Sequence, residues 1–154
     1  KAIAYDSRRK SPVMQMTSDS DQTQPQATRA IVCLGAILMA TGIVCGAFGA
    51  HAIKHSVSAE LLVVFDTAVL YHLIHSIAVL LVGVLSASKV ISAKVAERVT
   101  AGFVIGTATF SGSLYSLVLT NKGWLGVVTP FGGTLLILSW LWLAVLALQA
   151  PRQG

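Results

Sequence analysis

The chain has 154 residues, of which 55% are hydrophobic and only 11% are charged. Soluble domains carry about 25% charged residues, so this composition excludes an ordinary soluble fold and indicates a membrane protein. The formal net charge is +5, but no basic stripe or nucleic-acid-binding motif accompanies it, so we expect no nucleic-acid partner.

A polar segment precedes the apolar part of the chain. Residues 1–28 are rich in Ser, Asp, Gln and Pro, a composition typical of a disordered tail. We therefore predict a tail over 1–28 and a transmembrane domain over 29–154. The sequence begins with Lys, and it leaves open whether the residues before Met14 or Met16 belong to the natural chain.

Four long segments without Asp, Glu, Lys or Arg follow the tail, and they contain 22 to 29 residues each. A helix needs about 20 apolar residues to cross the hydrocarbon layer of a membrane. Because the connections are short, successive helices should pack antiparallel. The sequence thus predicts an all-α membrane protein with four transmembrane helices in an antiparallel bundle. The predicted spans are 30–52, 67–88, 99–120 and 124–149, with an interfacial turn through 60–65 before the second.

The basic residues predict the orientation of this bundle. With four spans, the two termini and the middle loop share one side of the membrane, and nine of the 11 Lys and Arg residues lie there. Lys54 and Lys122 lie on the other side. Cytoplasmic segments carry the excess of positive charge, so both termini should be cytoplasmic. We expect the inner membrane of a bacterium, with the mitochondrial inner membrane as the alternative.

Small residues mark the first and third spans. Gly42 and Gly46 form a GxxxG motif that is followed by Gly49, and Gly102 and Gly106 form a second such motif. Glycine lets helix backbones approach closely in lipid. We favour packing inside one bundle over a dimerisation face for these five residues.

Four histidines are the candidates for metal or haem binding. His51 and His55 are spaced i, i+4, and His72 and His75 are spaced i, i+3. Either spacing can place two imidazoles on one helix face, as metal and haem sites require. The sequence has no HExxH motif and no Cys beside a His. We therefore predict no metal and no cofactor, and keep metal or haem binding through histidine as an alternative.

Polar residues also form stripes on two spans. Tyr71 and His75 are four residues apart on the second span, as are Ser111 and Tyr115 on the third. Their expected depths match, so we predict that they converge inside the bundle in its outer half, joined by His51. The sequence shows no activated nucleophile, which predicts a structural or ligand-binding cluster, no catalytic residue and no enzyme.

Pro130, with Gly132 and Gly133, interrupts the fourth span near its outer end. Proline removes a backbone donor and should kink a helix at this point.

Several motifs occur in a characteristic order along the chain: Gly46–His51, Tyr71 with His75, Phe110–Tyr115, Thr129-Pro130 with Gly132-Gly133, and Trp140. Taken in order, they resemble the DUF423 family, which includes small bacterial inner-membrane proteins and the animal transmembrane protein 256. The resemblance covers about residues 30–148. It implies a four-span membrane protein and brings no settled activity, catalytic residue or cofactor. His72 stands where the family pattern would have Gln, which argues against a shared His72–His75 ligand pair.

The sequence therefore predicts a non-enzymatic membrane protein that serves as an accessory or scaffold subunit of a membrane complex. Its expected partners are the lipid bilayer and other membrane subunits or a second copy of itself. The alternative is an oligomeric transporter or channel for a small solute or lipid. No charged residue lies midway through any span, which argues against ion-coupled transport.

Overall fold

The computed structural model describes residues 12–149, and side chains from residue 26 onward. The described residues are all-helical and contain no strand, which confirms the predicted fold class. Four helices are long and apolar enough to cross a membrane. The elements are α1 (Pro12–His51), η1 (Ile53–His55), α2 (Ala59–Ala87), α3 (Ala93–Thr120), η2 (Gly123–Val127) and α4 (Thr129–Gln149), where η marks a 3₁₀ helix.

Three of the helices begin earlier than the predicted spans. α1 begins at Pro12, so helical backbone occupies much of the segment predicted as a tail, and residues 1–11 lie outside the described part. Proline suits the first helical position, where its missing N–H is not needed. α3 begins at Ala93 and includes Lys94. The predicted spans began after the last charged residue, whereas helices extend through charged turns at the membrane surface.

α2 begins at Ala59, so the segment predicted as an interfacial turn is helical. The side-chain oxygen of Ser58 accepts a hydrogen bond from the backbone N–H of Leu61 at 3.4 Å, and this cap satisfies a donor at the helix start. Glu60 lies in the first turn, where its negative charge interacts favourably with the helix dipole.

Pro130 begins a helix instead of kinking one. α4 starts at Thr129, so Pro130 lies in the first turn, where a missing N–H costs no intrahelical hydrogen bond. The break in the fourth span falls at Val128, between η2 and α4. Gly132 is a packing residue and not part of a kink, because a Cβ on it would lie 2.8 Å from the Cα of Phe110.

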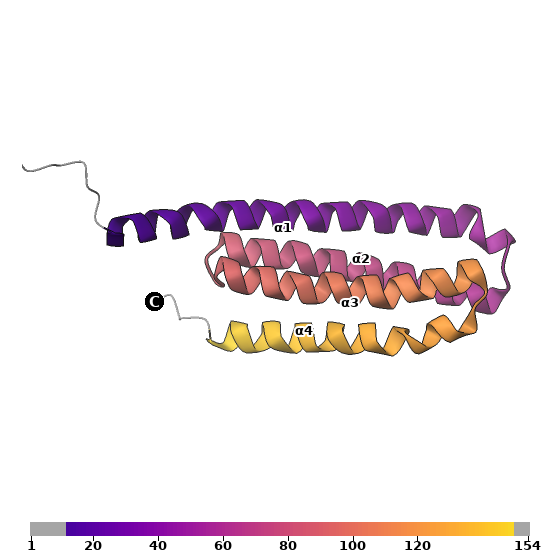
Figure 1. The fold of residues 1–154 in the computed structure, drawn as a ribbon. Helices are drawn as coiled ribbons and strands as arrows, with labels where there is room; N and C mark the ends of the chain where they lie inside the picture. Colours follow the sequence, from indigo (N-terminus) through magenta and orange to yellow (C-terminus); the bar gives the residue numbers. More distant parts are fainter. Residues whose placement is uncertain (1–11, 150–154) are drawn as a thin grey trace, which may run out of the picture.

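The helices form three layers, with α1 and α4 on opposite sides of the central α2–α3 pair (Figure 1). α1 packs mainly on α2, and α4 packs on α3. Within the described residues, α4 has no close backbone contact with α1 or α2. Consecutive long helices run antiparallel, so the start of α1 and the end of α4 lie at the same end (Figure 1). This arrangement leaves space between α2 and α4.

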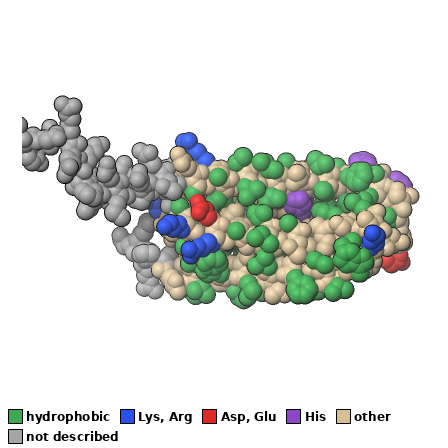
Figure 2. Space-filling model, in the orientation of Figure 1, with side chains coloured by type: hydrophobic (Ala, Val, Ile, Leu, Met, Phe, Trp, Pro, Cys, Tyr) green, Lys and Arg blue, Asp and Glu red, His purple; other side chains and the backbone are tan. Residues whose placement is uncertain are grey.

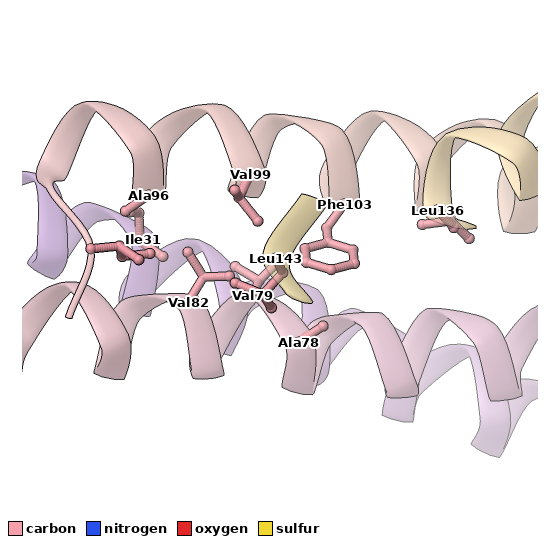
Figure 3. Packing of buried hydrophobic residues seen from close by; sticks show 10 residues of the cluster. Ile31, Ala78, Val79, Val82, Ala96, Val99, Phe103, Leu136 and Leu143 are labelled. Carbon is pink, nitrogen blue, oxygen red and sulfur yellow. The ribbon is translucent and has the colours of Figure 1, made fainter. Parts of the chain in front are cut away.

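The central core lies between α2 and α3. Val79 and Val82 of α2 pack with Val99 and Phe103 of α3 (Figure 3), and each side chain is fully buried. Leu136 of α4 belongs to the same cluster. These contacts hold α4 to the central pair through α3.

Glycines allow α1 to approach α2 closely. Gly42, Gly46 and Gly49 face side chains of α2. A Cβ on Gly42 would lie 2.8 Å from a methyl carbon of Leu73, and one on Gly49 would lie 2.8 Å from the ring of Phe65. Contacts this short would force a shift, so the α1–α2 interface depends on the missing side chains.

The glycines of α3 act in the same way on α4. Gly102 faces the hydroxyl of Ser139, and a Cβ on Gly106 would lie 2.7 Å from a methyl carbon of Leu136. All five glycines of the two GxxxG segments therefore lie at contacts between helices of this chain.

The outer surface is apolar along the helices and charged at the ends, as a membrane requires. Figure 2 shows basic and acidic side chains gathered towards the two ends of the visible face, with hydrophobic side chains between them. Lipid-facing side chains need no polar partners, whereas charges are stable only near water. The charged residues of the described side chains are Arg29, Lys89, Lys94, Glu97 and Arg98 at the end shared by the termini, and Lys54, Glu60, Asp66 and Lys122 towards the other.

Candidate functional site

The two histidines on α2, His72 and His75, lie in different surroundings. His72 contacts side chains of α1 and α3, whereas the ring of His75 lies among rings of α3 and α4. The two sites are therefore separate, although the two histidines are only three positions apart in the chain.

The first site is a polar junction of Thr41, Cys45, His72 and Tyr115. The Thr41 hydroxyl donates to the carbonyl of Leu38 at 2.9 Å, so Nε2–H of His72 donates to the Thr41 oxygen at 3.4 Å. Nδ1 of His72 then accepts from the Tyr115 hydroxyl, also at 3.4 Å. Tyr115 also lies close to Cys45. The junction joins α1, α2 and α3 and uses both ring nitrogens of its histidine.

The second site is a groove between α2 and α4, with α3 beneath it. Its volume is about 580 Å³. We call it the α2–α4 groove. Residues of the three helices line it: Tyr71, Ile74 and His75 from α2, Phe110 from α3, and Pro130, Gly133, Thr134, Leu136, Ile137 and Trp140 from α4.

Three aromatic residues, Tyr71, Phe110 and Trp140, form part of the walls of this groove. The rings of Tyr71 and Phe110 stack with centroids 4.2 Å apart and planes inclined by 24°. Trp140 meets Phe103 edge to face at 5.0 Å. Such offset and edge-to-face pairs are favourable for aromatic rings. The groove therefore presents flat apolar walls of fixed orientation.

His75 is the buried polar group of the groove, with 5% of its surface exposed. Its Nδ1 donates to the backbone carbonyl of Tyr71 at 2.7 Å. Its ring lies 6.0 Å from the ring of Phe103 and 6.4 Å from that of Trp140. The backbone hydrogen bond and the surrounding rings fix the imidazole in the wall.

The predicted convergence of five polar residues is wrong. Tyr71 and His75 line the groove, while Tyr115 belongs to the polar junction. Ser111 is buried, and its hydroxyl has no hydrogen-bond partner among the described residues. His51 is exposed at the end of α1. The stripes on α2 and α3 exist, but α4 provides a third neighbour, and the stripe on α2 turns to it.

Several residues of the two sites have no functional role that the sequence predicts. His72 was set aside because it departs from the family pattern, yet it joins three helices. Trp140 and Phe110 were quoted only for their resemblance to the family, and they form the groove walls. The available signal was their position, since Trp140 lies ten residues after Pro130 on α4 and Phe110 directly precedes Ser111 on α3.

The predicted histidine pairs do not form a shared site. His51 ends α1 and His55 lies in η1, so one regular helix does not carry both. Both side chains are exposed. Over the described part of the chain, no three His, Cys, Asp or Glu residues lie close enough to hold a metal ion together.

The chain matches the model of the family described as "Protein of unknown function (DUF423)" over residues 45–133. It is 39% identical to a UPF0382 membrane protein of Staphylococcus aureus (strain bovine RF122 / ET3-1) over 116 residues, which cover 74% of this chain and 91% of that protein. It is also 38% identical to the UPF0382 membrane protein YwdK of Bacillus subtilis (strain 168) over 125 residues, 79% of this chain and 98% of the relative. No solved structure matches the chain.

These matches define the class as a small four-helix membrane protein, in agreement with the four apolar helices. This chain belongs to the DUF423 family of membrane proteins of unknown function. The family resemblance drawn from the sequence motifs is thereby confirmed. Its bacterial relatives are named as membrane proteins, which agrees with the predicted localisation in a bacterial membrane.

Proposed function

We propose that this protein is a non-enzymatic membrane protein that binds a small lipid-soluble molecule in the α2–α4 groove. The observation that supports this most strongly is the groove itself, with a volume of about 580 Å³, three aromatic residues and one buried imidazole. Ligand sites in proteins are typically apolar concavities of about 300–1,000 Å³ with a few polar groups.

The length of the groove favours a small molecule over a partner helix. Its lining on α4 runs from Pro130 to Trp140, about 15 Å at 1.5 Å per residue. Its lining on α2 runs only from Tyr71 to His75, about 6 Å. A transmembrane helix spans about 30 Å of hydrocarbon, so the groove would accommodate at most half of it.

The rim of the groove favours a molecule that arrives from the lipid. Ile74 and Ile137 line the groove and are exposed on the outer surface of the helices. A solute dissolved in the bilayer would reach the aromatic walls sideways, without passing through water. This geometry supports the binding of a lipid-like solute more than the passage of an aqueous one.

Two buried serines that adjoin the lining residues His75 and Trp140 in the chain support a non-enzymatic role. Ser76 donates to the carbonyl of His72 at 2.7 Å, and Ser139 donates to that of Leu135 at 2.8 Å. A nucleophilic hydroxyl instead needs a base that accepts its proton. These hydroxyl hydrogens are directed at backbone carbonyls, which favours structural roles for both serines.

An accessory or scaffold role in a membrane complex is a second proposal, carried by the outer helices. In the most apolar 18-residue segment of each span, 17% of the residues are buried for α1 and 22% for α4. The corresponding shares are 44% for α2 and 39% for α3. The faces of α1 and α4 are therefore available to neighbouring proteins or to a second copy. Affinity purification from native membranes tests this role, and recovery without a stoichiometric protein partner would contradict it.

A groove-filling variant tests the main proposal. A Cβ on Gly133 would lie 3.5 Å from the Phe110 ring, an ordinary contact, so Gly133→Leu adds a side chain to the groove without a backbone clash. Gly112→Leu is the matched control, because a Cβ there meets nothing within 4 Å. Both variants and the unmodified chain would be extracted in native-lipid nanodiscs and analysed by native mass spectrometry.

We expect the unmodified chain and Gly112→Leu to carry the same small molecule, and Gly133→Leu to lose most of it. A molecule retained equally by all three chains would place its site elsewhere. Extraction of the unmodified chain without any discrete small molecule would contradict the proposal as well.

A further inference from the structure

One ring nitrogen of His75 has no hydrogen-bond partner among the described residues. Nδ1 lies 2.7 Å from the backbone oxygen of Tyr71. A carbonyl oxygen only accepts hydrogen bonds, so Nδ1 carries the hydrogen and Nε2 of the neutral ring is an acceptor. Charged side chains are costly inside a membrane, which favours this neutral form. Among the residues that the structure describes, none donates a hydrogen bond to Nε2.

The surroundings of His75 consist of aromatic rings. Tyr71, Phe103 and Trp140 place their ring centroids 5.7, 6.0 and 6.4 Å from that of the imidazole. The side chain lines the groove while only 5% of its surface is exposed. The buried side-chain atoms without a hydrogen-bond partner do not include Nε2 of His75. This acceptor is therefore accessible from the groove, where it can accept a hydrogen bond from the molecule that occupies it.

We infer that the α2–α4 groove binds a lipid-soluble phenol or hydroquinone, whose ring hydroxyl donates a hydrogen bond to Nε2 of His75. This inference rests on the proposed function and adds the chemical class of the ligand. The stacked rings of Tyr71 and Phe110 and the indole of Trp140 provide flat walls for a planar ring. An apolar tail would leave the groove past Ile74 and Ile137 into lipid.

The depth of His75 separates this class from ordinary lipids. His75 lies 16 residues after the first residue of α2 and 12 before the last, about 24 and 18 Å along the helix. The hydrocarbon layer is about 30 Å thick, so His75 lies near the centre of the membrane. Phospholipid head groups stay at the surface, far from Nε2. An ionised fatty-acid carboxylate only accepts hydrogen bonds and would not satisfy this nitrogen.

Three probes of almost equal shape test the inference. They are a decyl-substituted hydroquinone, the corresponding quinone, and the hydroquinone dimethyl ether. Only the first has a hydroxyl that can donate. Equilibrium binding of each would be measured on the full chain in lipid nanodiscs, under anaerobic conditions that keep the hydroquinone reduced. We expect the hydroquinone to bind at least tenfold more tightly than the other two.

Two histidine variants connect the preference to His75. His75→Leu should bind all three probes with similar affinity, because the acceptor is gone. His51→Leu, at an exposed helix end, should keep the tenfold preference. If His75→Leu does not fold, the comparison of the three probes on the unmodified chain still decides the question.

The outcomes separate the inference from the proposed function. Equal binding of the three probes that is lost in Gly133→Leu would overturn the hydrogen bond to His75 and leave the groove as a binding site. Tighter binding of the quinone would also overturn it. No binding of any probe would overturn the inference, while a different small molecule carried by the extracted chain would still support the proposed function.

Discussion

The hydroxyl of Tyr115 on α3 lies 3.4 Å from Nδ1 of His72 on α2. Three residues further along α2, His75 makes one hydrogen bond within the described part of the chain, to its own helix backbone. On one face of α2, His72 has its hydrogen-bond partner within the chain, and on another, His75 lies in the wall of an open groove. We therefore expect mutations on the first face to reduce stability and mutations on the second to change it little.

Removal of the Tyr115 hydroxyl should reduce stability. Tyr115→Phe removes the donor to His72 and keeps the ring that packs 5.1 Å from the ring of Phe65. Interhelical hydrogen bonds in membranes contribute about 0.6 kcal/mol on average and up to about 1.7. We expect a loss of that size in the free energy of unfolding, measured in mixed micelles of a mild detergent and dodecyl sulfate.

Tyr71→Phe is the matched control, because the Tyr71 hydroxyl makes no hydrogen bond within the described part of the chain while its ring stacks on Phe110. We expect little change in its free energy of unfolding. An equal loss in both variants would show that the Tyr115–His72 contact has no special importance.

Gly132 should not tolerate even one methyl group. A Cβ there would lie 2.8 Å from the Cα of Phe110 and 2.9 Å from the carbonyl oxygen of Gly106, and backbone cannot move away cheaply. Overpacking of this kind costs about 1–3 kcal/mol. Gly132→Ala should lower the unfolding free energy by that amount, while Gly112→Ala, in open space, should be neutral or slightly stabilising. Unchanged stability of Gly132→Ala would contradict the close α3–α4 contact.

The two serines that precede α2 and α3 should differ in importance. The side chain of Ser58 accepts the N–H of Leu61, whereas Ser92 makes no side-chain capping bond. Loss of an N-cap costs about 0.5–2 kcal/mol. Ser58→Ala should therefore lower the melting temperature in detergent, and Ser92→Ala should change it less. The reverse order would show that the Ser58 cap contributes nothing.

The orientation of the bundle remains a prediction from charge. Reporter fusions after Arg152 should report a cytoplasmic C-terminus, and impermeant labels on cysteines placed near Lys54 and Lys122 should react from outside. The expectation follows from the excess of Lys and Arg at the end shared by the termini. An external C-terminus would contradict it.

The spans were predictable from the sequence because hydrophobicity and charge act on each helix separately. The long apolar segments of α2 and α3 need no knowledge of their neighbours to be recognised. The ends of these helices were harder to predict, because Ser58 and Glu60 stabilise a helix start beyond the apolar segment. A search for uncharged segments identifies the part of each helix that lies in the hydrocarbon layer. It omits the helical turns that lie at the membrane surface.

The partners of each polar residue were not predictable in the same way. Successive helix residues differ by about 100° in direction, so Tyr71 and His72 turn to different neighbours although they adjoin in the sequence. Which neighbour each meets depends on where α4 packs. Gly106 and Gly132 set that position through contacts with Leu136 and Phe110, and sequence spacing alone carries no information about it.

Site-specific photo-crosslinking tests the central claim, ligand binding in the α2–α4 groove, most directly. A benzophenone amino acid would replace Ile74, which lines the groove, or Ile43, which is exposed on the opposite layer α1. After irradiation in native membranes, intact-mass analysis should show one discrete small-molecule adduct at Ile74 and a mixture of phospholipid adducts at Ile43. The same phospholipid mixture at both positions would contradict a ligand site in the groove.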